Sequence, residues 1–283
     1  MRYYKFGQIL DQRVVLSLGK DFFICILTWP LLYIWSYNAL ILQKLIINGL
    51  NSKIAVLYQH LTQALMFMLV MFFIIEQQWS LTNTAYATIH TCVHFMKMHS
   101  YTQMNKYYRE EWKQDQNQGQ QTSSYPNNIS FKNFTLYMWM PVLAYQIEYP
   151  RTDKFRIGFF LFKVFQVIIC ISLDYIIGIE FVIPYIELGD QIGGLQLMCY
   201  IVLPMTLFSM ISFVLIFEAT MNAFAEITYF GDRQFYQDWW NSTTYEEFNR
   251  KWNRTCLFGT YTQAQIQQNC CINYNFHILS SFA

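Results

Sequence analysis

A short aromatic and polar stretch at residues 235–241 is the part of the sequence best suited to binding chemistry. It reads Phe-Tyr-Gln-Asp-Trp-Trp-Asn and follows an apolar run long enough to cross a membrane. Two adjacent Trp beside an Asp can bury flat apolar surface while keeping hydrogen-bonding groups for a polar ligand. The alternative is an aromatic belt at the headgroup level of a membrane protein, and the residue types alone favour the belt.

The same stretch resembles the Phe-Tyr-x-Asp-Trp-Trp-Asn signature of the membrane-bound O-acyltransferases, in their sterol and diacylglycerol O-acyltransferase branch. Residues 96–101, Met-Lys-Met-His-Ser-Tyr, are similar to a second motif of that branch, and residues 230–233, Phe-Gly-Asp-Arg, also resemble it. Residues 149–152 read Tyr-Pro-Arg-Thr, as in fungal-type sterol acyltransferases, whereas the diacylglycerol enzymes tend to have Phe-Pro-Arg-Ser. The chain is identified as a member of this family, on the acyl-CoA:cholesterol acyltransferase side.

The resemblance implies an enzyme of the endoplasmic reticulum membrane that transfers a fatty acyl group from acyl-CoA to a sterol hydroxyl, giving a steryl ester. A base removes the hydroxyl proton, and no covalent acyl-enzyme is needed because CoA thiolate leaves readily. Asn253 matches a family Asn that positions the reacting groups. The residues expected to contact acyl-CoA are Phe235, Tyr236, Asp238, Trp239, Trp240 and Asn241. We expect no cofactor, since acyl-CoA is a substrate, and no metal.

The resemblance stops after Asn253, where the family continues with Pro-Val-His and later supplies a catalytic His followed by Glu. Here the chain reads Arg-Thr-Cys-Leu at residues 254–257, and His277 is followed by Ile278. We therefore expect a partial acyltransferase region at residues 1–254 and a non-matching tail at 255–283, as a shifted reading frame or an early stop would produce. These 283 residues alone are expected to be nearly inert.

The composition indicates a bilayer protein. Of 283 residues 54% are hydrophobic and only 13% are charged, about half the charge of a soluble domain. A net charge of +1 without a basic cluster argues against nucleic acid as a partner. The seven cysteines show no metal-ligand spacing.

The hydropathy pattern predicts an all-α, polytopic helical membrane protein, an incomplete version of the family's bundle. Four apolar runs are expected to span the bilayer: 22–42, 54–75, 158–185 and 195–217. A weaker fifth segment is expected at 85–98, a mobile linker at 106–124, and a short interfacial or re-entrant helix at 134–147, which Pro141 interrupts.

Isolated polar residues in these segments are interpreted as structural. His90 and His94 share a helix face, and bonding to nearby backbone is favoured over metal binding because no third ligand is evident. His99 is expected to cap the last carbonyls of a helix leaving the membrane. Glu180, Glu218 and Glu226 are expected to mark a polar interior of the bundle.

Three alternatives stay open. The first is a diacylglycerol O-acyltransferase that makes triacylglycerol, and the second is a non-catalytic remnant that pairs with a full-length relative in an oligomer. The third is a transporter, which the absence of matching broken helices in two halves of the sequence disfavours. The basic loops place the signature on the cytosolic side, where acyl-CoA is found.

Overall fold

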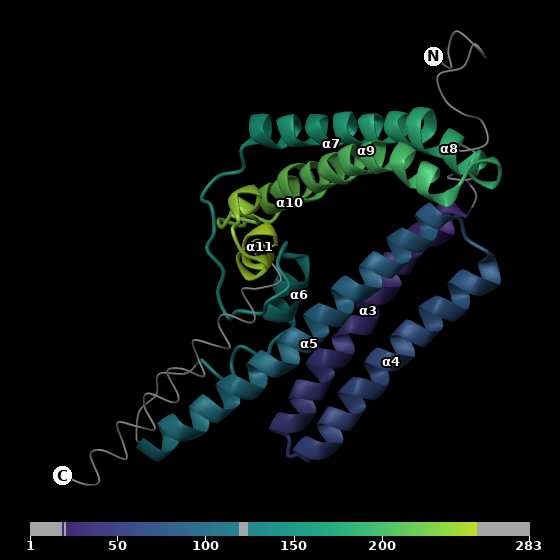
Figure 1. Ribbon diagram of the computed structural model, residues 1–283. Helices are drawn as coiled ribbons and strands as arrows, with labels where there is room; N and C mark the ends of the chain where they lie inside the picture. The colour runs from purple at the N-terminus through teal and green to yellow at the C-terminus, as the bar shows by residue number, and fades with distance from the viewer. Residues whose placement is uncertain (1–18, 20, 119–123, 254–283) are drawn as a thin grey trace. The chain divides into compact units, whose positions relative to one another are not determined.

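The computed structural model describes residues 19, 21–118 and 124–253 (Figure 1). Within those residues every regular element is a helix, and the backbone pairing outside helices includes one isolated antiparallel bridge, Arg151 with Phe230. The chain divides into two compact units. Unit 1 consists chiefly of Pro150–Phe235, and the described part of unit 2 comprises residues 23–118, 124–149 and 236–253. The expected all-α class is confirmed.

In the described part of the chain, four helical segments are long and apolar enough to cross a bilayer, namely Phe22–Ile47, Ser52–Gln77, Ile157–Glu187 and Gly194–Ile227. Each of the four apolar runs expected from the sequence lies within one of these segments, so the expected long apolar helices are confirmed. α3 (Phe22–Ile47) runs through Pro30 without a break. α4 (Ser52–Gln77) begins where the side chain of Asn51 accepts a hydrogen bond from the backbone of Lys53, and it ends at Gln78 in the left-handed region.

Unit 1 is built on a hairpin of two composite helices. The first consists of α7 (Ile157–Ile177), the π-helical segment η1 (Gly178–Val182) and α8 (Ile183–Glu187). After a short 3₁₀ turn, η2 (Gly189–Gln191), the chain returns through α9 (Gly194–Phe213), the π-helical η3 (Val214–Thr220) and α10 (Met221–Ile227). α7 packs against α9, η3 and α10, and Figure 1 shows α7 and α9 side by side.

α5 (Leu81–Gln118) corrects two sequence-based predictions. It is one continuous helix of 38 residues, so the segment does not end at residue 98, and residues 106–118 are helical rather than a linker. Lys, Arg, Glu and Gln fill its second half, and these residues have high helix propensity even though they carry no apolar period. Tyr108 and Trp112 also pack on the core of unit 2, which stabilises this half of the helix by tertiary contact. Residues 119–123 lie outside the described part of the chain.

α6 (Phe131–Trp139) is shorter than the expected helix at 134–147. The side chain of Ser130 accepts from the backbone N–H of Asn133 and caps its start. Pro141 disfavours helical backbone in the residue before it, and the C-cap residue Met140 is accordingly extended. The chain then runs without regular structure to Tyr149.

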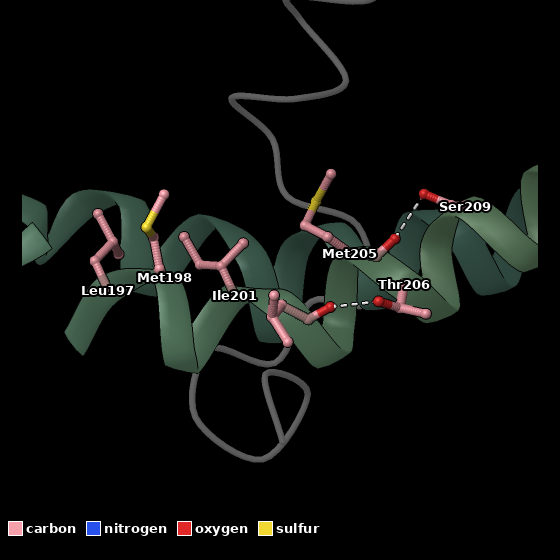
Figure 2. Close-up of a pocket in the computed structure, with 7 residues that line it drawn as sticks. Leu197, Met198, Ile201, Met205, Thr206 and Ser209 are labelled. Carbon is pink, nitrogen blue, oxygen red and sulfur yellow. Dashed lines mark hydrogen bonds between the residues drawn. The ribbon is translucent and has the colours of Figure 1, made fainter. Parts of the chain in front are cut away.

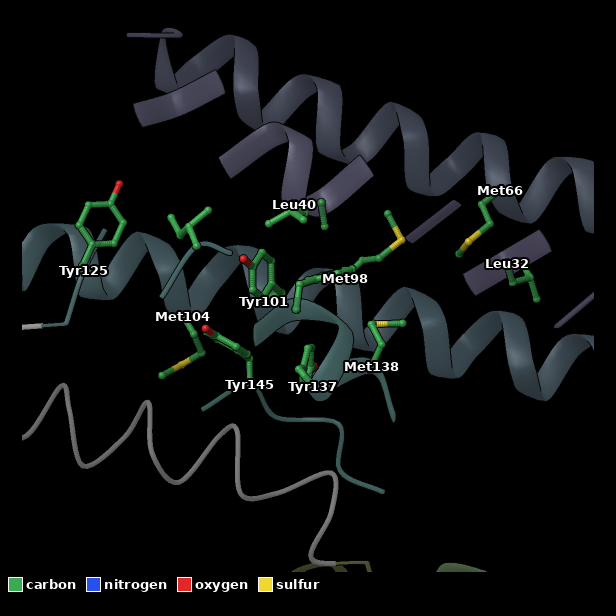
Figure 3. Close-up of a cluster of buried hydrophobic side chains, with 13 residues drawn as sticks. Leu32, Leu40, Met66, Met98, Tyr101, Met104, Tyr125, Tyr137, Met138 and Tyr145 are labelled. Carbon is green, nitrogen blue, oxygen red and sulfur yellow. The ribbon is translucent and has the colours of Figure 1, made fainter. Parts of the chain in front are cut away.

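The core of unit 2 joins α3, α4, α5, α6 and the connector after α6 (Figure 3). Tyr101, Tyr137 and Tyr145 are almost fully buried. The ring of Tyr145 meets Tyr101 at 4.7 Å and Tyr137 at 5.1 Å, edge to face in both pairs. Such pairs contribute about 0.5–1.5 kcal/mol beyond the area they bury, so the tyrosines fix α6 and the connector on α5.

Candidate functional site

The signature segment at residues 235–241 starts in unit 1 and continues in unit 2. Phe235 belongs to unit 1, where its ring is 3% exposed and stacks on Phe230 with centroids 6.3 Å apart. Trp239–Asn241 form a 3₁₀ turn in unit 2, next to a short amphipathic helix, α11 (Tyr245–Trp252). Phe235 is therefore fixed by packing within unit 1, and the exposed residues of the segment, Gln237, Asp238, Trp240 and Asn241, come after it.

α11 has the residues that a short helix needs at both ends. Thr244 is the N-cap, and its hydroxyl accepts from the backbone N–H of Glu247 at 3.1 Å. The Glu247 carboxylate accepts from the backbone and hydroxyl of Thr243 and pairs with Lys251 one turn later, at 2.8 Å. The hydrogen bond from Lys251, followed by those from Thr243, lowers the pKa of Glu247 to about 2. The carboxylate therefore stays charged at physiological pH.

Three contacts hold the signature segment on α11. The backbone N–H of Gln237 donates to the carbonyl of Lys251 at 2.8 Å. The ammonium of the same lysine pairs with Asp238 at 3.1 Å. The ring of Trp239 meets Phe248 edge to face, with centroids 5.8 Å apart. The Asp238 carboxylate thus orients the loop, a role that the motif alone did not reveal.

Trp240 and Asn241 lie on the outer surface of this arrangement. The Trp240 side chain is 62% exposed, its ring nearly perpendicular to Trp239 at 5.9 Å, and Asn241 is also exposed. An exposed indole beside an exposed amide can offer an aromatic face and hydrogen-bonding groups to a ligand with a flat polar ring. Trp240 and Asn241 are therefore the residues of the signature that we expect to contact a ligand.

Asn253 follows the last residue of α11 and is partly buried. The preceding Trp252 stacks on Phe248 with centroids 6.3 Å apart, so the aromatic side chains that hold Trp239 also fix the end of the helix before Asn253. Its expected positioning role stays a prediction, because the residues from 254 onward lie outside the described part of the chain.

Two other family-like motifs meet in unit 1. The backbone N–H of Gly231 donates to the carbonyl of Pro150 at 2.7 Å, and Thr152 N–H donates to the carbonyl of Tyr229 at 2.9 Å. A β-carbon on Gly231 would lie 3.1 Å from both the carbonyl carbon and oxygen of Pro150. A side chain at this position would press on the Pro150 backbone, so glycine suits the close approach of the Phe-Gly-Asp-Arg and Tyr-Pro-Arg-Thr backbones.

Replacing Gly231 by Ala should destabilise unit 1 by about 1–3 kcal/mol, because the added methyl group overlaps backbone that cannot move independently. Thermal unfolding of the purified chain in detergent measures the effect. Gly158→Ala is the matched control, since nothing lies within 4 Å of a β-carbon there. An equal unfolding temperature for both variants would contradict the close approach.

Glu226 is fully buried, and its carboxylate accepts hydrogen bonds from two arginines. It accepts from the backbone N–H of Arg156 at 2.6 Å, from the guanidinium of Arg156 at 3.0 and 3.3 Å, and from Arg233 at 2.6 Å. Arg156 precedes α7, and Arg233 belongs to the Phe-Gly-Asp-Arg motif. This confirms that Glu226 marks a polar interior, and it adds two partners that the sequence analysis missed.

The packed face of α7 carries further polar groups. Lys163 donates to Glu218, and Ser212 donates to Asp174 at 3.0 Å. Charged residues inside an apolar span normally pair within the bundle. The presence of Lys163 and Asp174 in the sequence of this span could therefore have predicted these contacts. They hold the two helices of the hairpin together.

Lys97, in the Met-Lys-Met-His-Ser-Tyr motif, has an unexpected role. The residue is 4% exposed, and its ammonium donates to the carbonyls of Tyr137, Met138 and Met140 at 3.0, 2.9 and 2.7 Å. These carbonyls end α6, so Lys97 caps the C-terminus of a helix 40 residues away in the sequence. In the same motif, the Ser100 hydroxyl accepts from the backbone N–H of Tyr145 at 2.9 Å. The motif positions α6 and its connector.

The histidines of α5 are structural in this arrangement. His94 bonds to the carbonyl of His90 at 2.8 Å, as expected, and burial lowers the pKa of His94 to about 4. The prediction that His99 caps a helix end was wrong, because α5 continues past it for 19 residues to Gln118. Its Nδ1 lies 3.3 Å from the Gln59 amide. Within the described residues no group of three or more possible metal ligands gathers.

A shallow groove of about 550 Å³ runs along α9 (Figure 2). Its lining is Leu197, Met198, Ile201, Val202, Met205, Thr206 and Ser209. The hydroxyls of Thr206 and Ser209 donate to carbonyls of α9 itself, at 2.7 and 2.8 Å. The groove therefore offers an apolar surface suited to lipid tails and no group for chemistry.

The fold and the helices' composition define a polytopic helical membrane protein. The family model of the membrane-bound O-acyltransferases (MBOAT) matches residues 55–256, well over half of the sequence. The chain belongs to the membrane-bound O-acyltransferase family.

Curated relatives come from both branches discussed above. The chain is 30% identical to the probable sterol O-acyltransferase 2 of Schizosaccharomyces pombe over 213 residues, 62% of this chain and 45% of the relative. It is 37% identical to sterol O-acyltransferase 1 of Saccharomyces cerevisiae over 145 residues, 46% of this chain and 24% of the relative. It is 26% identical to diacylglycerol O-acyltransferase 1 of Bos taurus over 278 residues, 88% of this chain and 56% of the relative. The chain thus spans about half or less of the length of the curated relatives it matches.

Proposed function

We propose that this chain forms the acyl-CoA-binding part of an acyl-CoA-dependent sterol O-acyltransferase of the endoplasmic reticulum. The observation that carries the proposal is the signature loop, held on α11 through Lys251 and Phe248 with Trp240 turned outward. Membership of the family supports the reaction type, and the names of several relatives support the acceptor.

In this proposal the loop binds the acyl donor and the chemistry takes place next to it. Trp240 and Asn241 contact the nucleotide end of acyl-CoA, with its flat base and polar edges. The fixed loop lowers the entropic cost of holding the thioester near the acceptor hydroxyl. Asn253 orients the reacting groups, and a general base removes the hydroxyl proton as the ester forms and CoA thiolate leaves.

A sterol acceptor is favoured by the Tyr-Pro-Arg-Thr sequence at residues 149–152. Diacylglycerol is the second candidate, because the match to the bovine diacylglycerol O-acyltransferase 1 covers 88% of the chain, more than the 62% covered by the fission-yeast relative. The signature loop does not distinguish the two, since both branches contain it.

Donor binding can be tested on the 283-residue chain itself. Trp240→Ala should weaken binding of a fluorescent long-chain acyl-CoA analogue at least about tenfold, as removal of an exposed aromatic anchor does at binding hot spots. Fluorescence anisotropy of the analogue with purified protein in detergent gives the affinity.

Tyr245→Ala is the matched control, because Tyr245 is 81% exposed at the start of α11 but lies outside the signature. We expect its affinity to stay within about twofold of wild type. If the two variants bind the analogue equally well, the signature loop is not the donor site.

A further inference from the structure

Two guanidinium groups share a single carboxylate at the start of α7. Glu226 accepts four hydrogen bonds, three from Arg156 and one from Arg233, so its acceptor positions are filled. One negative charge therefore faces two positive ones. The cluster has a surplus of one positive charge, which the contacts of the carboxylate do not neutralise.

The neighbouring groups do not neutralise this surplus positive charge, because they are engaged in other contacts. Both guanidiniums lie over the ring of Phe159, at 4.6 and 5.3 Å from its centroid. Lys163 also lies over that ring, at 5.3 Å, but pairs with Glu218. The Asp232 carboxylate accepts from the backbone N–H of Gln234 in a local turn. The Nε–H of Arg233 is buried and has no acceptor among the residues that the structure describes.

The side chain of Arg156 is the part of the cluster that is most exposed to solvent. Its side chain is 52% exposed, whereas that of Arg233 is 19% exposed. The ring of Phe159 lies against both guanidiniums, and the exposed edge of Arg156 is where an anion can reach its N–H groups. The first turn of α7, which has no side-chain cap, adds the positive end of the helix dipole.

The position in the chain indicates which anions reach the cluster. Arg156 immediately precedes the apolar segment Ile157–Glu187, so it lies at the depth where a span meets lipid headgroups. The planar fork of an arginine matches the oxygens of a phosphate in bidentate geometry. A phosphate would supply the missing negative charge and accept from the free part of the fork.

We propose that Arg156 and Arg233, paired through Glu226 and backed by Phe159, form a phosphate-binding site separate from the signature loop. The ligand chemistry is a phosphate ester, supplied by the headgroup of an anionic phospholipid or by a soluble phosphorylated compound such as coenzyme A. The site does not depend on the proposed acyltransferase activity.

Native mass spectrometry of the 283-residue chain in neutral detergent tests the proposal. The probes are dioleoyl phosphatidic acid, dioleoyl phosphatidylcholine and free coenzyme A at matched concentrations. We expect phosphatidic acid to bind more tightly than phosphatidylcholine, and Arg156→Gln to weaken its binding about tenfold. Lys154→Gln, an exposed basic residue of the same loop, is the matched control and should change affinity less than about twofold.

Two further variants cover the possibility that Arg156→Gln does not fold, which its thermal unfolding curve reveals. Arg156→Lys keeps the charge but not the fork and should give an intermediate loss. Glu226→Gln removes the competing carboxylate and should raise phosphate affinity in the folded fraction. If Arg156→Gln weakens only the binding of phosphatidic acid, the site binds a lipid headgroup. If it weakens only the binding of coenzyme A, the site binds a soluble phosphate. If it weakens both, the site accepts a phosphate ester from either source. Equal effects of Arg156→Gln and Lys154→Gln on every probe would overturn the proposal.

Discussion

Replacing Lys97 by Met should lower the free energy of unfolding by about 2–4 kcal/mol, one of the largest effects expected in this chain. The side chains are of similar length, so packing is largely kept while all three N–H donors are lost. The carbonyls of Met138 and Met140 then lose this donor at the end of α6, and each unsatisfied buried acceptor costs about 1–3 kcal/mol. Removing a buried charge offsets part of that cost.

Lys106→Met is the matched control because it makes the same change on α5 at an exposed position. Its unfolding free energy should stay within about 0.5 kcal/mol of wild type. Both values come from denaturant or thermal unfolding in detergent. Hydrogen exchange of amides 142–149 should rise in the Lys97 variant alone, since the connector follows the capped end of α6.

Lys97 should also make stability depend on pH in a defined direction. Burial lowers its pKa to about 7, below the ordinary value of 10.5 that applies in the unfolded chain. Between these values the unfolded state binds more protons than the folded state, so stability rises with pH from about 7 towards 10. The buried tyrosines beside it have raised pKa values and do not titrate in the lower part of this range.

The measurement is the unfolding temperature at pH 7 and pH 9 for wild type and for Lys97→Met. Wild type should gain stability relative to the variant as the pH rises. A pH dependence that is the same in both proteins would show that Lys97 stays charged throughout.

The spans could be predicted from the sequence because each is a predominantly apolar run at least as long as a bilayer crossing, as at Ile157–Glu187. The second half of α5 could not, because its stability depends on Tyr108 and Trp112 packing against residues distant in sequence. A polar sequence without apolar period is typical of both a linker and a solvent-facing helix, and only tertiary contact decides between them.

The same limit applies to the site. The signature could be found by its rare residue types, and Glu226 by the high cost of a carboxylate in a span. The pairing of Asp238 with Lys251, and the capping of α6 by Lys97, join residues 13 and about 40 positions apart. No local periodicity signals such contacts. The resemblance named the motifs, but it did not say that two of them serve mainly to position backbone.

The second large effect concerns turnover. The resemblance implies a general base beyond a Pro-Val-His sequence, and residues 254–257 of this chain do not match that sequence. General-base catalysis contributes about 10²–10⁴ in rate. The 283 residues alone should therefore form ester at a rate lower by about that factor than a version continued past Asn253 with the family's sequence.

The most direct test of the proposed function is ester formation in microsomes of a host that lacks its own sterol and diacylglycerol acyltransferases. The continued version is supplied with radiolabelled acyl-CoA and both acceptors, a sterol and diacylglycerol. We predict labelled steryl ester, at a level that Trp240→Ala reduces and Tyr245→Ala does not. Label in triacylglycerol alone would contradict the sterol assignment, and no labelled ester of either kind from a folded, membrane-inserted protein would contradict the acyltransferase function itself.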